Sequence, residues 1–181
     1  MTIRRSAPAR AGLLGNPSDG YSGKCIAVSV ENFSATVRCE ASRRLRFAPG
    51  RRDRREFESV TALLRKIDRT GYYGGIRLLM ATVRRFHDHC RERAIDLHDR
   101  NFSLGYTTDI PDHVGLAGSS AIVTAAFRCL VAFHDVEIDR DVLPTLVLEV
   151  ETDELGIPAG LMDRVVQVHR GLVHMDLRRG V

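Results

Sequence analysis

The most informative stretch of the chain reads PDHVGLAGSSA, from Pro111 to Ala121. It follows a strand candidate at 101–109 and precedes a helix candidate at 121–133 that is rich in small apolar residues. Glycines let the backbone approach a ligand closely, and successive amides at the start of a helix point at an anion. The stretch lacks the Gly-Lys-Ser/Thr of a Walker A loop and the spacing of a Rossmann fingerprint. It therefore indicates another kind of phosphate loop, with a plain strand-to-helix turn capped by serine as the alternative.

A second polar segment, RAGLLGNPSDGYSG, spans residues 10–23. A strand that ends in such a polar turn would bring Asn16, Ser18 and Asp19 to one rim, where they could hold the hydroxyls of a sugar. The alternative is an Asn-Pro turn in which Asp19 caps backbone amides, which is common chemistry for these residues.

The third segment, ETDELGIPAGLMD, spans residues 151–163. Glu151 falls near the end of one predicted helix and Asp163 near the start of the next, so the two carboxylates can converge on one cleft. One would hold a divalent cation and the other would face a hydroxyl. The alternative is a solvated acidic helix end, with Asp163 as a favourable charge at a helix start.

Together and in this order, the three segments resemble the GHMP small-molecule kinases, a family that includes galactokinase, homoserine kinase and mevalonate kinase. The resemblance covers the chain from about residue 9 to residue 176. Within the family, the segment at 10–23 and the ending GLMDRVVQVHRGLVHMD are most similar to the glucuronokinase type. Asn16 and Pro17 stand where galactokinases have Glu and His, which argues against galactose as the substrate.

The resemblance implies a role for each matching residue. Asp163 matches the catalytic base and Arg10 the basic residue beside it, whereas Ser120 and Glu151 match the magnesium ligands. The implied phosphate-binding residues are Gly115, Leu116, Ala117, Gly118, Ser119, Ser120 and Ala121, and the implied substrate-binding residues are Asn16, Ser18, Asp19 and Tyr21.

The activity implied by the resemblance is that of an ATP-dependent sugar kinase that uses Mg²⁺. It would transfer the γ-phosphoryl group to the anomeric hydroxyl of a sugar or a uronic acid such as glucuronate. The implied fold is an α+β, two-layer β-α-β domain of the kind also found in ribosomal proteins, over residues 9–181 and preceded by a tail at 1–8. The family's third glycine-rich motif lies in a C-terminal domain that we expect to be absent here, so a separate C-terminal domain or a homodimer is an expected partner.

Hydrophobic periodicity predicts the individual elements. Residues 25–30 and 33–37 alternate as two strands of a hairpin, with Glu31 and Asn32 as its turn. Strands come first and helices dominate later, without regular alternation, which is typical of the α+β class. Further strands are predicted at 10–14, 101–109 and 171–176, and helices at 57–70, 76–90, 121–133, 139–155 and 161–168.

The charge of the chain is unevenly distributed. The 181 residues include 27 Lys+Arg and 23 Asp+Glu, and only Lys24 and Lys66 are lysine. Arginine suits carboxylate and phosphate ligands, so the basic first half could serve an anionic ligand. The densest arginine run, residues 43–55, predicts a solvated loop between a strand and a helix. The run contains few aromatic residues, which argues against nucleic acid as a partner.

A non-catalytic or split-subunit domain of the same fold, binding RNA or a protein, is the alternative function. The presence of Ser120, Glu151 and Asp163 together favours the kinase, because a binding module has no need for all three.

Other features of the sequence bear on cellular compartment, cysteine state and metal binding. The longest run without a charged residue, 113–127, is too short and too rich in glycine and serine to span a membrane. No apolar segment of secretory length follows the basic N-terminus, so we expect a cytoplasmic protein with four reduced, mostly buried cysteines. The segment His87-Asp-His-Cys90 places too few ligands on one helix face for structural zinc.

Overall fold

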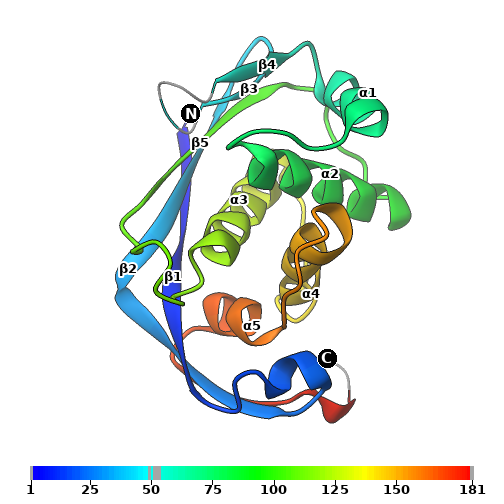
Figure 1. Ribbon diagram of the computed structural model, residues 1–181. Coiled ribbons are helices and arrows are strands. Elements are labelled where there is room, and N and C mark those ends of the chain that lie inside the picture. Colours follow the sequence, from blue (N-terminus) through cyan, green and yellow to red (C-terminus); the bar gives the residue numbers. More distant parts are fainter. Residues whose placement is uncertain (1, 49, 51–53, 180–181) are drawn as a thin grey trace.

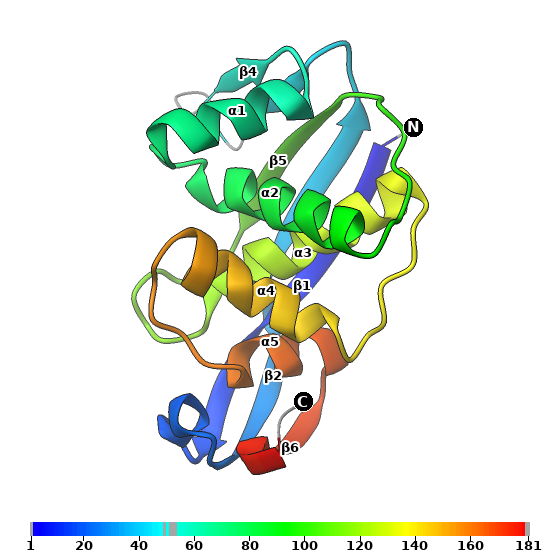
Figure 2. The same ribbon diagram turned by 90° about the vertical axis from the view of Figure 1, so that its right-hand side faces the viewer.

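The computed structural model describes residues 2–48, 50 and 54–179. In these residues a twisted six-stranded sheet forms one layer and helices cover one of its faces (Figures 1 and 2). The strands are β1 (Thr2–Leu14), β2 (Lys24–Ala41), β3 (Leu45–Phe47), β4 (Arg55–Phe57), β5 (Phe102–Thr108) and β6 (Leu172–Asp176). The helices are α1 (Val60–Thr70), α2 (Arg77–Glu92), α3 (Gly118–His134), α4 (Leu143–Glu149) and α5 (Met162–His169). The α+β class predicted from the sequence is confirmed.

Two long antiparallel strands, β1 and β2, run the length of the molecule (Figure 1). The far edge of β2 pairs with β5 along Ala35–Ala41 and with β6 along Lys24–Val28. The sheet order is β1-β2-β5-β3-β4, in which only the β3–β5 pairing is parallel. Strand β2 therefore joins the upper part of the sheet, under α2 and α3, to the lower part, under α5.

The predicted hairpin within residues 25–37 is wrong. Opposite β1, the register of β2 shifts from Ser34, the partner of Pro8, to Val30, the partner of Ala9. Residues 31–33 are thus extra residues within one strand, because an irregularity in a long ladder accommodates the polar residues that would otherwise mark a turn.

The predicted tail is also wrong for the residues that the structure describes. Residues 2–8 form the first part of β1, and Ala7 is completely buried against the core. The tail prediction failed because arginines and a proline at the start of the chain hide an edge strand, where an exposed polar face and a proline are tolerated.

Helix α3 is the centre of the domain. It packs against β1 and β2 on one side and against α2, α4 and α5 on the other. Small side chains such as Ala121, Ala125 and Ala126, all completely buried, let these neighbours approach closely. A helix that is apolar almost all round is buried in this way.

The flanking helices follow their sequence signals with small shifts. Ser59 caps α1 by accepting a hydrogen bond from the Ala62 amide at 3.2 Å, and Gly71 ends the helix with a φ of 67°. The predicted helix at 139–155 consists of α4, with Pro144 in its first turn, followed by a π-helical turn, Val150–Glu154. Turns of the π type are frequent at functional sites.

Two clusters of buried side chains hold the fold together. The larger lies between the upper sheet and helices α1–α4, and the smaller surrounds Met162 and Met175 where α5 covers the lower sheet. All four cysteines are buried and free, as predicted. Burial raises the pKa of Cys39 to about 12 and that of Cys129 to about 11.

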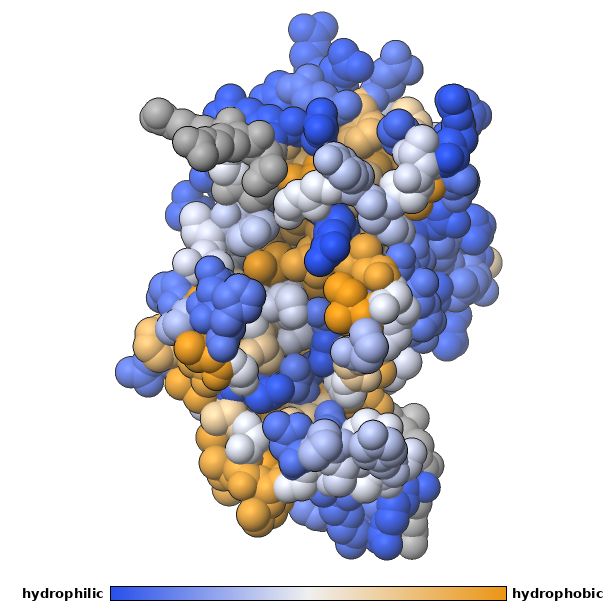
Figure 3. Space-filling view, viewed as in Figure 1, coloured by the Kyte–Doolittle hydropathy of each residue, from blue (hydrophilic) through white to orange (hydrophobic). Residues whose placement is uncertain are grey.

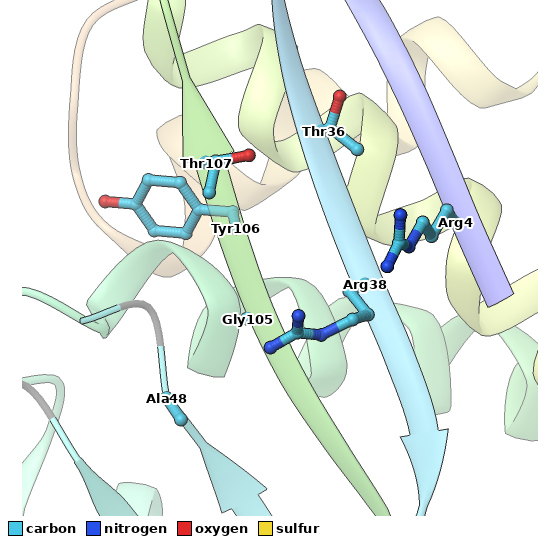
Figure 4. A pocket seen from close by; sticks show the side chains of 7 residues that line it. All are labelled: Arg4, Thr36, Arg38, Ala48, Gly105, Tyr106 and Thr107. Atoms are coloured by element: carbon cyan, nitrogen blue, oxygen red, sulfur yellow. The ribbon is translucent and has the colours of Figure 1, made fainter. Parts of the chain in front are cut away.

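The arginine run at 43–55 is only partly a loop. Its described residues include β3 and the start of β4, where Arg46 pairs with Glu56 at 2.7 Å, and residues 49 and 51–53 lie outside the described part. The sheet face that carries no helices has a shallow hollow of about 300 Å³, in which Arg4, Thr36 and Arg38 extend from β1 and β2 (Figure 4). No helix within the described ranges has the length and apolar character needed to cross a membrane.

Candidate active site

A cleft of about 530 Å³ lies between the 3-10 helix Ser18–Tyr21, the start of α3 and the start of α5. The surface is hollowed between this lower 3-10 helix and the helices above it (Figure 3). The cleft is lined by Arg10, Asn16, Pro17, Asp19, Gly20, Tyr21, Ser119, Glu151, Ile157, Pro158, Ala159, Gly160, Met162, Asp163 and Arg164. The three segments singled out in the sequence therefore meet at one place.

The loop between β5 and α3 is held in an unusual backbone conformation. His113, Gly115 and Ala117 all have positive φ angles, between 59° and 74°. The Arg10 amide donates to the Leu116 carbonyl at 3.2 Å, and Arg10 Nη1 donates to the Gly115 carbonyl at 3.1 Å. Strand β1 thus fixes the loop from one side, and glycine at position 115 makes its left-handed conformation inexpensive.

The loop leads directly into the free amides of a helix start. The first helical hydrogen bond runs from the Ala121 amide to the Ala117 carbonyl at 3.2 Å, so the amides of Gly118, Ser119 and Ser120 precede the helical ladder. Gln167 Nε2 of α5 also donates to the Ala117 carbonyl, at 2.8 Å, and holds this end of α3 in place. Such amides, together with the helix dipole, favour an anionic group.

The two serines of the loop have different environments. Ser120 is completely buried, and its hydroxyl donates to the Ala117 carbonyl at 3.2 Å. Ser119 is exposed and lines the cleft. Ser119, rather than Ser120, is thus the serine that faces the cleft, and the role of Ser120 as a metal ligand stays a prediction. Helix α3 begins at Gly118 rather than at Ala121, and the next residue along a helix points about 100° away.

Arg10 and Asp163 form the principal ion pair of the cleft. Arg10 Nε donates to Asp163 Oδ1 at 2.6 Å, and Arg10 Nη2 contacts the same oxygen. Burial raises the pKa of the Asp163 carboxyl above its ordinary value, although the Arg10 guanidinium opposes the shift. The carboxylate is thus a better proton acceptor than an exposed aspartate would be.

A buried arginine that the sequence analysis did not single out links the two carboxylates. Arg164 Nη2 forms an ion pair with Glu151, and Arg164 Nη1 lies 3.3 Å from Asp163 Oδ2 and donates to the Gly160 carbonyl at 2.8 Å. Burial, followed by the nearby Arg10 cation, lowers the pKa of Arg164 to about 10. The available signal was weak, namely one basic residue directly after Asp163 in the acidic half of the chain.

The other end of the cleft is built around Asp19. The Met162 amide donates to Asp19 Oδ2 at 3.4 Å, and a Cβ on Gly160 would overlap this carboxylate. Asn16 and Tyr21 line the same end, and Tyr21 is 84% exposed. This end therefore presents a carboxylate, an amide and a phenol, which suit polyhydroxylated ligands.

Ser18, which was predicted to contact substrate, does not line the cleft. Its hydroxyl donates to the backbone carbonyls of Gly15, at 2.5 Å, and Lys24, at 2.9 Å. Ser18 therefore stabilises the turn that carries Asn16 and Asp19. Of the predicted loop residues, Ser119 borders the cleft, whereas Gly115 and Leu116 hold Arg10 and Ala121 is part of the core.

The oxygen atoms available at the cleft fit a hard divalent cation. Ser119 supplies a hydroxyl and Glu151 a carboxylate, the kinds of ligand that Mg²⁺ takes alongside water and phosphate oxygens. Ser119 and Glu151 both line the cleft, and in this structure Glu151 forms its ion pair with Arg164.

Comparison with known proteins agrees with this geometry. The family profile described as GHMP kinases N terminal domain matches residues 77–171, which is about half of the chain. The matched part includes the loop before α3, the π-helical turn and α5.

The chain belongs to the GHMP kinase family. Glucuronokinase 1 from Arabidopsis thaliana is 50% identical over 180 residues, which cover 98% of this chain and 49% of that protein. Probable glucuronokinase 2 from the same plant is 49% identical over 175 residues, covering 94% of this chain and 48% of the relative. The chain thus spans about half the length of these curated relatives.

A solved GHMP-family fold also superimposes on the chain. The galactokinase of Lactococcus lactis, complexed with galactose, superimposes with a TM-score of 0.81 at 16% identity. The superposition covers 98% of the present chain and 45% of the galactokinase. At this identity the match supports the fold alone. The family profile and the two plant relatives confirm the family, and they confirm the similarity to glucuronokinases that the sequence indicated.

Proposed function

We propose that this chain is the N-terminal domain of a sugar kinase that transfers the γ-phosphoryl group of ATP to the anomeric hydroxyl of a uronic acid such as glucuronate. About half of its residues are identical to those of glucuronokinase 1. The observation that carries the proposal is the convergence of Arg10, Asp163, Glu151 and Ser119 on one cleft beside the start of α3.

In this proposal Asp163 is the base. The carboxylate accepts the proton of the attacking sugar hydroxyl as its oxygen forms a bond to the γ-phosphorus and the bond to the ADP oxygen breaks. Burial favours this role because it raises the proton affinity of Asp163. Arg10 holds the carboxylate through Nε and leaves the proton-accepting Oδ2 toward Arg164 and the cleft.

The phosphate groups would lie at the start of α3, where the amides of Gly118, Ser119 and Ser120 precede the helical ladder. Ser119 and Glu151 would hold Mg²⁺, which when bound neutralises charge on the phosphates. Arg164 keeps Glu151 ion-paired before the nucleotide binds, so the site carries no unpaired buried carboxylate.

The sugar would bind at the Asp19 end of the cleft. Asp19 accepts hydrogen bonds from sugar hydroxyls, whereas Asn16 and Tyr21 supply a mixed donor and acceptor surface. The distance between phosphate loop and sugar is set by α5, because its N-terminus carries Asp163 and its preceding residues, Gly160–Met162, contact Asp19.

The test measures ATP-dependent phosphorylation of glucuronate by ³¹P NMR, together with Mg·ATP binding by calorimetry. We expect an anomeric phosphate as product, with turnover at least about 100-fold lower in Asp163→Asn while Mg·ATP binding is retained. Asp68→Asn is the matched control, because Asp68 is an exposed carboxylate on α1 that pairs with Arg84.

The outcomes separate the parts of the proposal. Failure to bind Mg·ATP would contradict the kinase assignment. Phosphorylation of a neutral sugar but not of glucuronate would contradict the substrate alone. Equal turnover of Asp163→Asn and the wild-type chain would remove Asp163 as the base.

A further inference from the structure

A second hollow, of about 620 Å³, lies away from the cleft, where the start of β1, the middle of α3 and the C-terminal end of α5 meet. We call it the arginine groove. It is lined by Arg4, Arg5, Ser6, Arg128, Val131, Ala132, Ile138, Arg140, Leu143, Val168 and Arg170. Five of these side chains are guanidinium groups, and none of them takes part in the candidate active site.

The guanidinium groups lie close together because they share acceptors. Arg128 donates to the Val168 carbonyl at 3.1 Å, and Arg140 donates to the same oxygen at 3.2 Å. Arg128 also donates to the Ser6 carbonyl at 2.9 Å, which Arg170 approaches at 3.5 Å. Two backbone oxygens thus bring three cations within a few ångströms of one another.

The positive charge of the groove is poorly compensated. Among residues 2–48, 50 and 54–179, Arg170 has an ion pair with Glu31 at 3.6 Å, but Arg5, Arg128 and Arg140 have none. The carbonyls at the end of α5 carry only about half a negative charge in total. Burial lowers the pKa of Arg128, and the cations Arg170, Arg140 and Arg5 lower it further, as expected for like charges held together.

Capping the C-terminus of α5 explains part of this arrangement. One or two cations near the last carbonyls are enough for that purpose. The remaining guanidinium N–H groups border an open hollow whose other wall is apolar, formed by Val131, Ile138 and Leu143. An anion in the hollow would relieve the repulsion between the guanidinium groups and accept hydrogen bonds from their remaining N–H groups. Water would accept these hydrogen bonds but would not neutralise the charge.

We propose that the arginine groove is a binding site for a small molecule that carries a phosphate group. Guanidinium forks match phosphate oxygens in geometry and charge. The apolar wall suits a non-polar part of the same ligand, and the volume falls within the range of small-molecule sites. The site is separate from the cleft, because Ser119 and Arg128 are nine residue steps apart on α3, which span about 14 Å.

The choice of variants follows from the contacts. Arg4 is left unchanged, because its side chain also lines the hollow on the opposite sheet face, beside Arg38 (Figure 4). Arg5 and Arg140 are exposed, so the double variant Arg5→Gln/Arg140→Gln is expected to fold. The matched control, Arg65→Gln/Arg69→Gln, removes the same charge from the exposed side of α1.

The experiment titrates pyrophosphate into the 181-residue chain by calorimetry, at constant ionic strength, with malonate as a dicarboxylate comparison. We expect the control to match the wild type, and the Arg5→Gln/Arg140→Gln variant to lose one binding site or to bind there at least tenfold more weakly. Malonate should bind at least tenfold more weakly than pyrophosphate. Circular dichroism and thermal unfolding verify that both double variants are folded.

Three results would overturn the proposal. Identical pyrophosphate titrations for all three proteins would assign phosphate binding to the cleft alone. If pyrophosphate does not bind to the wild type, the arginines have only a structural role, as donors to the carbonyls at the end of α5 and to the Ser6 carbonyl of β1. Equal affinity for malonate and pyrophosphate would make the groove a general anion site without preference for phosphate, which the proposal excludes.

Discussion

The Arg10–Asp163 pair allows a prediction whose size can be derived from its surroundings. Replacing Arg10 with Met leaves the Asp163 carboxylate, whose side chain is 16% exposed, without its main partner. Breaking a buried ion pair in this way costs about 3–5 kcal/mol. Because Arg164 Nη1 remains 3.3 Å from Asp163, the lower end applies, and we expect the free energy of unfolding to fall by about 3 kcal/mol at pH 7.

The loss should depend on pH in a defined direction. Burial raises the pKa of Asp163 in the folded state and Arg10 lowers it, so the Arg10→Met variant has a still higher folded pKa. Between the unfolded value of about 3.9 and that folded pKa, the folded state holds a proton that the unfolded state has released. Stability then falls as pH rises through this window, so acidification towards pH 4 should recover most of the loss.

Urea unfolding of four proteins tests this reasoning: the wild type, Arg10→Met, Asp163→Asn and the double variant. The expected shift in midpoint for Arg10→Met at pH 7 is about 1 M urea, from a slope of about 2–3 kcal/mol/M for a domain of this size. The double-mutant cycle should give a coupling energy of about 2 kcal/mol at pH 7 that shrinks on acidification. Additive effects at pH 7, or a loss that stays constant from pH 8 to pH 4.5, would refute the account of this pair.

The remaining predictions concern the loop, a histidine and the thiols. Ser119→Ala should weaken Mg²⁺-dependent nucleotide binding about tenfold or more, because Ser119 lines the cleft. Ser120→Ala should leave nucleotide binding nearly unchanged and only lower the stability of the fold, because the Ser120 hydroxyl donates to the Ala117 carbonyl. Calorimetry that gives the reverse order of affinities would contradict Ser119 as the metal ligand. Burial, followed by the nearby His98 and His87, lowers the pKa of His134 to about 3, so the free energy of unfolding should fall as the pH drops from about 6.5 towards 4. The variant His134→Leu should reduce the slope of unfolding free energy against pH by up to about 1.4 kcal/mol per pH unit. An unchanged slope in urea titrations would exclude His134 as a cause. The four buried cysteines should react with Ellman's reagent at pH 8 only on unfolding, and rapid labelling of the native chain would show that the core opens readily.

Several elements were predictable because their signals are local. Helix α1 has a serine cap, apolar residues at helical spacing and a terminal glycine, all within 13 residues of one another, and the structure keeps each of them. The same holds for α2, α5 and β5, whose predicted bounds differ from the observed ones by a residue or two.

Long-range pairing was not predictable in the same way. Glu31 and Asn32 are good turn residues, but the partner strand β1 pairs with β2 on both sides of them, and the chain continues as one strand with an irregularity instead of turning back. Nothing near residues 31–33 in the sequence reveals that residues 2–14 lie alongside. The strand character of residues 2–8 was hidden for the same reason.

The candidate site was predictable in its segments but not in its contacts. Arg10, Asp19, Glu151 and Asp163 do meet at one cleft, as their motifs indicated. The choice between two adjacent serines depends on where α3 begins, a boundary that sequence patterns locate only to within a few residues. Arg164 was missed because its role arises from burial between two carboxylates, which only the folded chain provides.

The most direct test of the account is a crystal structure of the chain with Mg²⁺ and a non-hydrolysable ATP analogue. We predict the terminal phosphate at the start of α3, facing Asp163, with the cation on Ser119 and Glu151 and with Arg164 no longer paired to Glu151. Nucleotide phosphates bound elsewhere, for example in the arginine groove, with the Glu151–Arg164 pair intact, would contradict it.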